Sequence, residues 1–274
     1  MNVAIIGCGY VGYKVAQYWQ QNMNFVVTAT TTSPERVSVL QSVAQRVVVT
    51  KGNDPDTLKS VLQNQDVVLL SVGAKSAEVY EETYLQTANT LVSVLRYIPN
   101  VKQLIYTGSY AVYGDRNGVW VDEETPLAPA NLNAQILRKT EDVLLSASNE
   151  NLRVCIFRLG GIYGTGRELL KIFGRYSGTS RPGTGEDITN WIHLDDIVAA
   201  IEFARHRRLE GVYNLVDDAH LTSRDLLDRL FAKHHLPPVI WDTSVTSTRP
   251  YNAWVSNEKL KEAGYELIHP QMIF

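Results

Sequence analysis

The stretch Met1–Lys14, MNVAIIGCGYVGYK, places a G-x-G-x-x-G pattern directly after a short apolar run. After the last glycine, apolar residues recur at helical spacing. The pattern therefore predicts a buried strand, then a glycine loop, then an amphipathic helix. In that context Gly7 allows a tight turn, Gly9 lets a pyrophosphate approach the backbone, and Gly12 lets helix and strand pack closely. The stretch therefore predicts dinucleotide binding rather than a plain turn, with Tyr10 and Val11 at the helix N-terminus.

Strand and helix patterns alternate along the next part of the chain. Pro34 and Pro55 each follow a residue that suits a helix N-cap, which marks two helix starts. The alternation predicts an α/β protein with a Rossmann-type, doubly wound parallel sheet and a small C-terminal substrate lobe. Further strands are expected at 25–31, 46–50, 66–72, 102–109 and 152–159, and further helices at 34–42, 78–97 and 131–147.

Composition and charge restrict the classes of function. The 274 residues are 45% hydrophobic and 20% charged, as in an ordinary globular protein. The net charge of -3 does not indicate a basic surface that would bind nucleic acid. The first apolar run is too short for a signal peptide or a membrane span. We therefore expect a cytoplasmic protein that binds neither nucleic acid nor a membrane. Cys8 is expected to be a small packing residue rather than a reactive thiol.

In a doubly wound sheet, ligands bind at the carboxyl ends of the strands. The second predicted strand ends in Thr30, Thr31 and Thr32, with Arg36 close behind and no carboxylate at the strand end. Hydroxyls and an arginine suit a 2′-phosphate, so NADP is favoured as the cofactor. NAD remains open, because Glu35 could still reach a ribose hydroxyl and the threonines suit any strand.

Two later strand ends complete the predicted cofactor site. Asn53 follows the third strand, where it could border the adenine; the neighbouring Asp54 could do the same or cap the next helix. After the fourth strand come Ser71, Val72 and Gly73, which are small enough to let a cofactor lie against the backbone.

Several later segments carry a family resemblance. They are YTGSYAVYG at 106–114, RLGGIYG at 158–164, WIHLDDI at 191–197 and SNEKLKEAGY at 256–265. Together they resemble the extended short-chain dehydrogenase/reductases, the NAD-dependent epimerase/dehydratase family. The resemblance implies that Thr107 and Arg158 contribute to the cofactor site and that Ser109 orients a substrate oxygen.

The helix expected at 131–147 departs from this family. The family uses a Tyr that moves a proton and a Lys four residues later that lowers the pKa of the phenol. Counted from Ser109, those roles fall on Ala134 and Arg138, and no tyrosine lies in the helix. Arg138 could direct a cation at the cofactor but is no readily deprotonated base. The chain thus resembles an atypical branch of the family.

Other groups could carry the chemistry. Tyr113 offers a phenol near the expected nicotinamide end, although a packed aromatic is the more common role for such a residue. His193 is expected to position its neighbours rather than to act as a general base. The histidines show no metal-ligand spacing, so no metal site is predicted.

By resemblance, a cofactor domain is expected at 1–164 with 189–217, and a substrate lobe at 165–188 with 218–274. Arginines that could meet an anionic substrate in the lobe are Arg167, Arg175, Arg181 and Arg249. The family also implies a possible homodimer through the helices at 78–97 and 131–147.

Two functions remain open from the sequence. One is an NAD(P)-dependent oxidoreductase, epimerase or dehydratase acting on a small hydroxylated or carbonyl compound, possibly a sugar nucleotide, with Ser109 holding the reacting oxygen. The other is a non-catalytic NADP-binding redox sensor or partner-binding module. The absent Tyr/Lys pair favours the second function, and the intact TGS and RLGGIYG segments favour the first.

Overall fold

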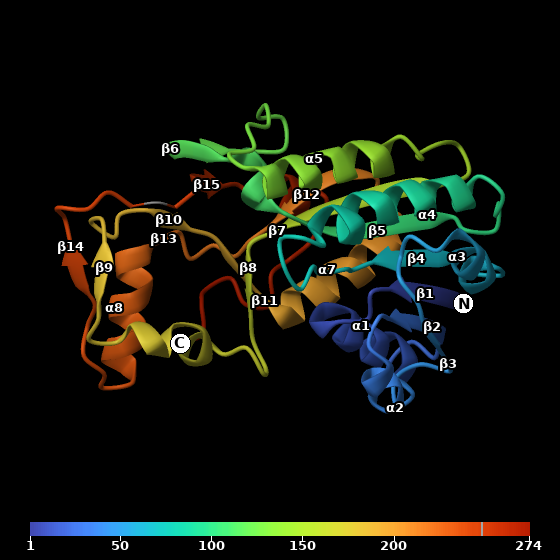
Figure 1. Ribbon diagram of the computed structural model, residues 1–274, viewed down its shortest axis with the longest axis horizontal. Coiled ribbons are helices and arrows are strands. Elements are labelled where there is room, and N and C mark those ends of the chain that lie inside the picture. The colour runs from blue at the N-terminus through green and yellow to red at the C-terminus, as the bar shows by residue number, and fades with distance from the viewer. Residues whose placement is uncertain (248) are drawn as a thin grey trace. The chain divides into compact units, whose positions relative to one another are not determined.

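The computed structural model describes residues 1–247 and 249–274, and a seven-stranded sheet is the centre of its first compact unit (Figure 1). The strand order is β12-β7-β5-β4-β1-β2-β3, and the four pairs from β5 to β3 run parallel. The predicted Rossmann-type sheet is therefore confirmed. Its strands are β1 (Asn2–Ile6), β2 (Val26–Thr31), β3 (Arg46–Val49), β4 (Val67–Leu70), β5 (Gln103–Ser109), β7 (Arg153–Leu159) and β12 (Gly211–Leu215).

Helices cover both faces of this sheet (Figure 1). The core on one face joins alternate strand residues, such as Ala4, Val68 and Leu104, to Leu58 of α3 and Leu91 of α4. Alternate residues share a face because the side-chain period of a strand is two. The helices of this unit are α1 (Tyr10–Gln21), α2 (Val37–Leu40), α3 (Pro55–Leu62), α4 (Thr87–Leu95), α5 (Leu132–Leu145) and α7 (Leu194–Arg207), whose first turn clusters with the second unit.

Local sequence signals account for several element boundaries. The carboxylate of Asp54 accepts a hydrogen bond from the backbone N–H of Thr57, so Asp54 caps α3 and Pro55 is its first residue. The single helix expected at 78–97 instead contains a π-helical turn, Glu82–Gln86, before α4. A π-turn inserts a residue into the helical ladder, which apolar periodicity does not reveal.

The second compact unit consists of short strand pairs and helices. Its main core surrounds α8, where Leu226, Leu230 and Phe231 are almost fully buried. A reciprocal capping box formed by Thr222 and Asp225 begins that helix. The strand pairs are β6 (Asp115–Val121) with β15 (Asn252–Val255), β8 (Gly161–Tyr163) with β11 (Trp191–His193), β9 (Ser180–Pro182) with β14 (Ile240–Asp242), and β10 (Ile188–Thr189) with β13 (Leu221–Thr222). The helices are α6 (Leu169–Phe173), α8 (Ser223–Lys233) and α9 (Glu258–Glu262).

The boundaries of the compact units differ from the predicted domains. Residues 110–131, 159–164, 189–197 and 214–217 were expected in the cofactor domain, and they cluster with the second unit. For residues 110–131 the physical reason is strand pairing, since β6 pairs with β15 of the second unit. Within the described part of the chain, we find no helix with both the length and the apolar character needed to span a bilayer.

Candidate functional site

A cavity of about 400 Å³ lies at the carboxyl ends of β1, β2 and β4, within the first unit. That size is in the range of small-molecule sites in proteins. Most of the cofactor residues predicted from the sequence line it. They are Gly7, Gly9, Thr30, Thr31, Thr32, Arg36, Asn53, Ser71, Val72 and Gly73.

The three glycines of the loop have three different geometric roles. Gly7 has a φ of +84°, and a Cβ there would lie 2.7 Å from Cγ1 of Val72, so only glycine fits this turn. A Cβ on Gly9 would meet nothing within 4 Å, which leaves room for a ligand against the backbone. A Cβ on Gly12 would lie 3.0 Å from the carbonyl oxygen of Gly7, at the contact between α1 and β1. The geometry thus assigns the tight turn to Gly7, open space to Gly9 and a close helix–strand contact to Gly12.

Two cationic side chains line the cavity beyond the end of β2. Arg36 was expected there, whereas Lys75 was not. The Nζ of Lys75 donates a hydrogen bond of 3.2 Å to the hydroxyl of Ser33, which also lines the cavity. Lys75 lies in the loop after β4 and reaches Ser33 only in the folded chain, so periodicity gave no signal for it. Glu35 is not among the described residues that line the cavity.

The wall of the cavity next to α4 is polar. The amide of Asn53 donates to the side-chain oxygens of Glu82 and Gln86, each at 3.2 Å, and Lys51 pairs with Glu82 at 2.7 Å. Asp54 caps α3 and is not among the described lining residues, so the structure favours capping of the two roles left open for it.

The floor of the cavity is formed by small residues after β4. A Cβ on Gly73 would meet nothing within 4 Å, as at Gly9, so backbone is accessible on both sides of the cavity. Thr107 supports this floor from β5, because its hydroxyl lies 3.1 Å from the hydroxyl of Ser71, to which it donates.

Cys8 is almost fully buried, and burial raises the pKa of its thiol to about 12. That thiol is therefore a packing group rather than a nucleophile.

Arg158 lies in a buried ion pair. Its guanidinium donates to the carboxylate of Glu141 on α5, with Nη2 2.8 Å from Oε2, and both side chains are almost fully buried. Arg158 is not among the described residues that line the cavity over the glycine loop. The structure thus gives this arginine a partner from its own unit, which the family resemblance did not indicate.

The three candidate catalytic residues occupy different environments. Ser109 ends β5 and is half-buried. Tyr113 is fully buried, and its hydroxyl donates a hydrogen bond of 2.8 Å to Oδ1 of Asn214. Arg138 is an exposed residue of α5, and Ala134 on the same helix is buried. Of the two roles left open for Tyr113, the structure favours the packed aromatic, because its phenol already has a buried acceptor.

A second cavity, of about 370 Å³, lies within the second unit. Arg181 and Arg249 line it, whereas Arg167 and Arg175 are exposed and are not among its described lining residues. The guanidinium of Arg249 is held by the hydroxyls of Ser223, at 3.0 Å, and Tyr110, at 3.2 Å. The lobe therefore presents two cations at one cavity.

Two tryptophans that line this cavity carry buried indole N–H groups. Trp191 and Trp241 both line it, and the buried Nε1 atom of each has no hydrogen-bond partner within residues 1–247 and 249–274. Buried N–H groups without an acceptor are rare in native proteins, since each carries its full desolvation penalty. Both nitrogen atoms are closed to solvent, so these N–H groups are not part of the open surface of the cavity.

The sequence and the fold are similar to those of known proteins. Residues 3–215 match the model of the NAD dependent epimerase/dehydratase family. Protein YeeZ of Escherichia coli (strain K12) is 31% identical over 225 residues, which cover 80% of this chain and 78% of that protein.

Two solved structures show the same fold. A dTDP-glucose 4,6-dehydratase from Bacillus anthracis, in complex with NAD, has a TM-score of 0.80 at 20% identity and covers 98% of this chain and 92% of its own. A UDP-glucose 4-epimerase from Thermotoga maritima, with UDP-glucose, has a TM-score of 0.81 at 19% identity, covering 98% and 94%. At these identities the likeness establishes the fold alone.

Proposed function

The chain belongs to the NAD-dependent epimerase/dehydratase family, and on that premise we propose that it binds NADP in preference to NAD and moves a hydride to or from an anionic substrate. The observation that carries the proposal is the cavity over the glycine loop, where Gly9 and Gly73 leave open space against the backbone. The substrate class is a small hydroxylated or carbonyl compound, with a sugar nucleotide as the favoured example.

The residues of the chain have distinct parts in this reaction. When bound, the nicotinamide supplies the group that accepts or donates hydride. The N-terminus of α1, which begins after Gly9, favours the negative charge of a pyrophosphate. Ser109 holds the reacting oxygen of the substrate by a hydrogen bond. The proton is moved by an acid other than the usual tyrosine, because α5 contains none.

The preference for NADP rests on charge beyond the end of β2. Arg36 and Lys75 line the cavity with the hydroxyl of Ser33, and no described carboxylate lines it except that of Glu82. Glu82 is paired with Lys51 on the α4 side. A 2′-phosphate would gain charged hydrogen bonds from Arg36 and Lys75, whereas a 2′-hydroxyl would gain little.

We therefore expect the double variant Arg36→Ala, Lys75→Ala to bind NADPH at least about 100-fold more weakly, since hydrogen bonds to charged groups contribute about 1.5–3 kcal/mol each. NADH affinity should change by less than about threefold, and calorimetric titration measures both. The matched control is Lys51→Ala, which removes a cation of the same cavity that is paired with Glu82. Equal losses for NADPH and NADH would contradict the assignment of the 2′-phosphate.

The substrate class rests on the cavity of the lobe. Two arginines and two tryptophans line one space, and the guanidinium groups suit a ligand rich in phosphate oxygens. The relative from Thermotoga maritima carries UDP-glucose, a ligand of this chemical class. The same cavity has aromatic walls, which suit a base or a sugar ring.

Replacing Arg249 with methionine is expected to weaken binding of UDP-glucose by about tenfold or more, through loss of a charged hydrogen bond. Calorimetry in the presence of saturating NADPH measures the effect. Arg167→Met is the matched control, because Arg167 is exposed and is not among the described residues that line the cavity of the lobe. If the unchanged chain binds NADPH but neither UDP-glucose nor UDP, the cofactor proposal stands and the substrate class is wrong.

The second candidate function is a non-catalytic NADP-binding sensor. It is favoured by the absence of tyrosine from the sequence of α5 and by the engagement of Tyr113 with Asn214. A screen of NADPH oxidation and NADP reduction with sugar nucleotides and small carbonyl compounds separates the two. Tight NADPH binding without turnover of any compound, and without ligand binding in the lobe, would favour the sensor.

A further inference from the structure

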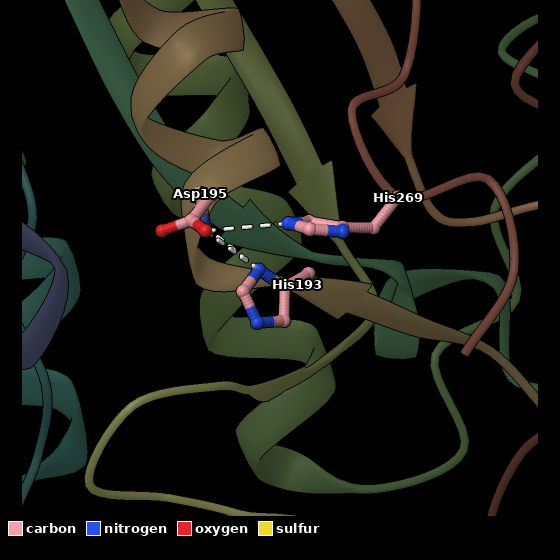
Figure 2. A group of neighbouring side chains, drawn as sticks. All are labelled: His193, Asp195 and His269. Carbon is pink, nitrogen blue, oxygen red and sulfur yellow. Dashed lines mark hydrogen bonds and ion pairs between the residues drawn. The ribbon is translucent and has the colours of Figure 1, made fainter. Parts of the chain in front are cut away.

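We propose that His193, Asp195 and His269 form a binding site for Zn²⁺ or a similar divalent transition metal. All three residues belong to the second unit. Figure 2 shows both imidazole rings with a nitrogen directed at the carboxylate of Asp195, and one atom of that carboxylate, Oδ2, is the partner of both rings. None of the three residues is among the described residues that line either cavity.

The distances between the ligand atoms suit a tetrahedral metal. Oδ2 of Asp195 lies 3.4 Å from Nδ1 of His193 and 3.2 Å from Nε2 of His269, and the three atoms lie within 4.8 Å of one another. Zinc binds imidazole nitrogen and carboxylate oxygen at about 2.0–2.2 Å, so neighbouring ligands of a tetrahedral ion stand roughly 3.3 Å apart. Both nitrogen–oxygen distances therefore already match the spacing of neighbouring ligands on a tetrahedral ion.

One nitrogen is held in the form that binds metals. Nδ1 of His193 accepts a hydrogen bond of 3.2 Å from the backbone N–H of Asp195, which leaves that nitrogen without a proton and with its lone pair near the carboxylate. A lone pair and a carboxylate oxygen repel each other unless a cation or a proton lies between them. A metal ion would replace the long amide contact and neutralise this repulsion.

The surrounding contacts fix the positions of the ligands. His193 ends β11 and its ring packs edge-on against Tyr163 at 5.1 Å between centroids. Asp196 is fully buried, and its carboxylate accepts the backbone N–H of Ile268 at 2.6 Å and that of His269 at 3.0 Å. The backbone carbonyl oxygen of Asp196 accepts a hydrogen bond from the hydroxyl of Tyr265. Asp196 thus holds the C-terminal segment against the start of α7 and places His269 beside His193.

The donor set determines the class of metal. Two imidazoles and one carboxylate suit Zn²⁺, Co²⁺ or Ni²⁺, whereas Mg²⁺ and Ca²⁺ prefer oxygen ligands throughout. The side chain of Asp195 is 58% exposed, so an ion can enter from solvent and keep a water at its fourth position. A bound ion would tie the segment around His269 to β11 and the first turn of α7.

The test uses the full chain without a histidine tag, stripped with chelator and titrated calorimetrically with ZnCl₂. We expect one zinc per chain, a raised melting temperature, and the visible absorption of tetrahedral Co²⁺ when cobalt is used instead. His269→Ala and Asp195→Asn should each weaken zinc binding at least about 100-fold, because even outer-shell partners of metal ligands contribute 10–100-fold. Two variants are used so that one that fails to fold does not decide the result.

The matched control is His234→Ala, which removes an exposed histidine at the C-terminus of α8 that lies outside the cluster. It should bind zinc as the unchanged chain does. Zinc should also slow proteolysis of the C-terminal segment in the unchanged chain and not in His269→Ala. The proposal is overturned if zinc does not bind, if both folded ligand variants retain full affinity, or if Mg²⁺ binds as tightly as Zn²⁺.

Discussion

Replacing Arg158 with alanine is expected to lower the free energy of unfolding by about 3–5 kcal/mol, because the carboxylate of Glu141 would be left buried without its partner. The guanidinium of Arg158 donates to both oxygens of that carboxylate, at 3.2 Å and 3.1 Å from Nε and at 2.8 Å from Nη2. Glu141 is 1% exposed, so water cannot replace these hydrogen bonds. Urea denaturation followed by circular dichroism measures the loss.

Two further variants make this expectation specific. Arg153→Ala removes an exposed arginine of the same strand, β7, and should change stability by less than about 1 kcal/mol. The pair of changes Arg158→Met and Glu141→Leu removes both charges and should recover most of the loss, since a buried ion pair is often replaceable by apolar residues of similar volume. A double variant as unstable as Arg158→Ala would show that the loss comes from packing and not from the unpaired carboxylate.

Changing Gly9 to aspartate is expected to weaken binding of NADPH and NADH at least about 100-fold while leaving the fold intact. A Cβ at Gly9 meets nothing within 4 Å, so the new side chain extends into the space assigned to the pyrophosphate and repels its charge. Gly9 is also the N-cap residue of α1, a position at which aspartate is favoured over glycine by only a few tenths of a kcal/mol, so the helix should not be destabilised. Calorimetric titration measures the affinity, and thermal unfolding measures the stability.

Two substitutions serve as comparisons for Gly9→Asp. Gly9→Ala adds volume without charge and should weaken binding less. Gly7→Ala should destabilise the chain instead, because Gly7 has a φ of +84° and a Cβ there would lie 2.8 Å from the carbonyl oxygen of Ser71. Unchanged nucleotide affinity in a folded Gly9→Asp protein would place the dinucleotide elsewhere and remove the basis of the proposed function.

Much of the fold could be predicted from local patterns. The apolar runs and glycine loop led to the sheet strands, and Asp54 and Thr222 were recognisable as helix caps from their spacing. The π-turn at Glu82–Gln86 was not recognisable, because one inserted residue does not interrupt an apolar stripe over so short a length. The boundaries of the compact units differ from the expected domain boundaries, since strands such as β6 and β15 are paired across more than a hundred residues of chain.

The sequence by itself determined the sheet, the glycine loop and the residues after each strand, because these depend on neighbours along the chain and on the periods of helix and strand. Only the tertiary structure decided which distant side chains meet. Lys75 reaches Ser33, Arg158 pairs with Glu141, and His193 faces His269. Such contacts arise where packing brings separate elements together, and the periodicity of a single element does not indicate which other element it will contact.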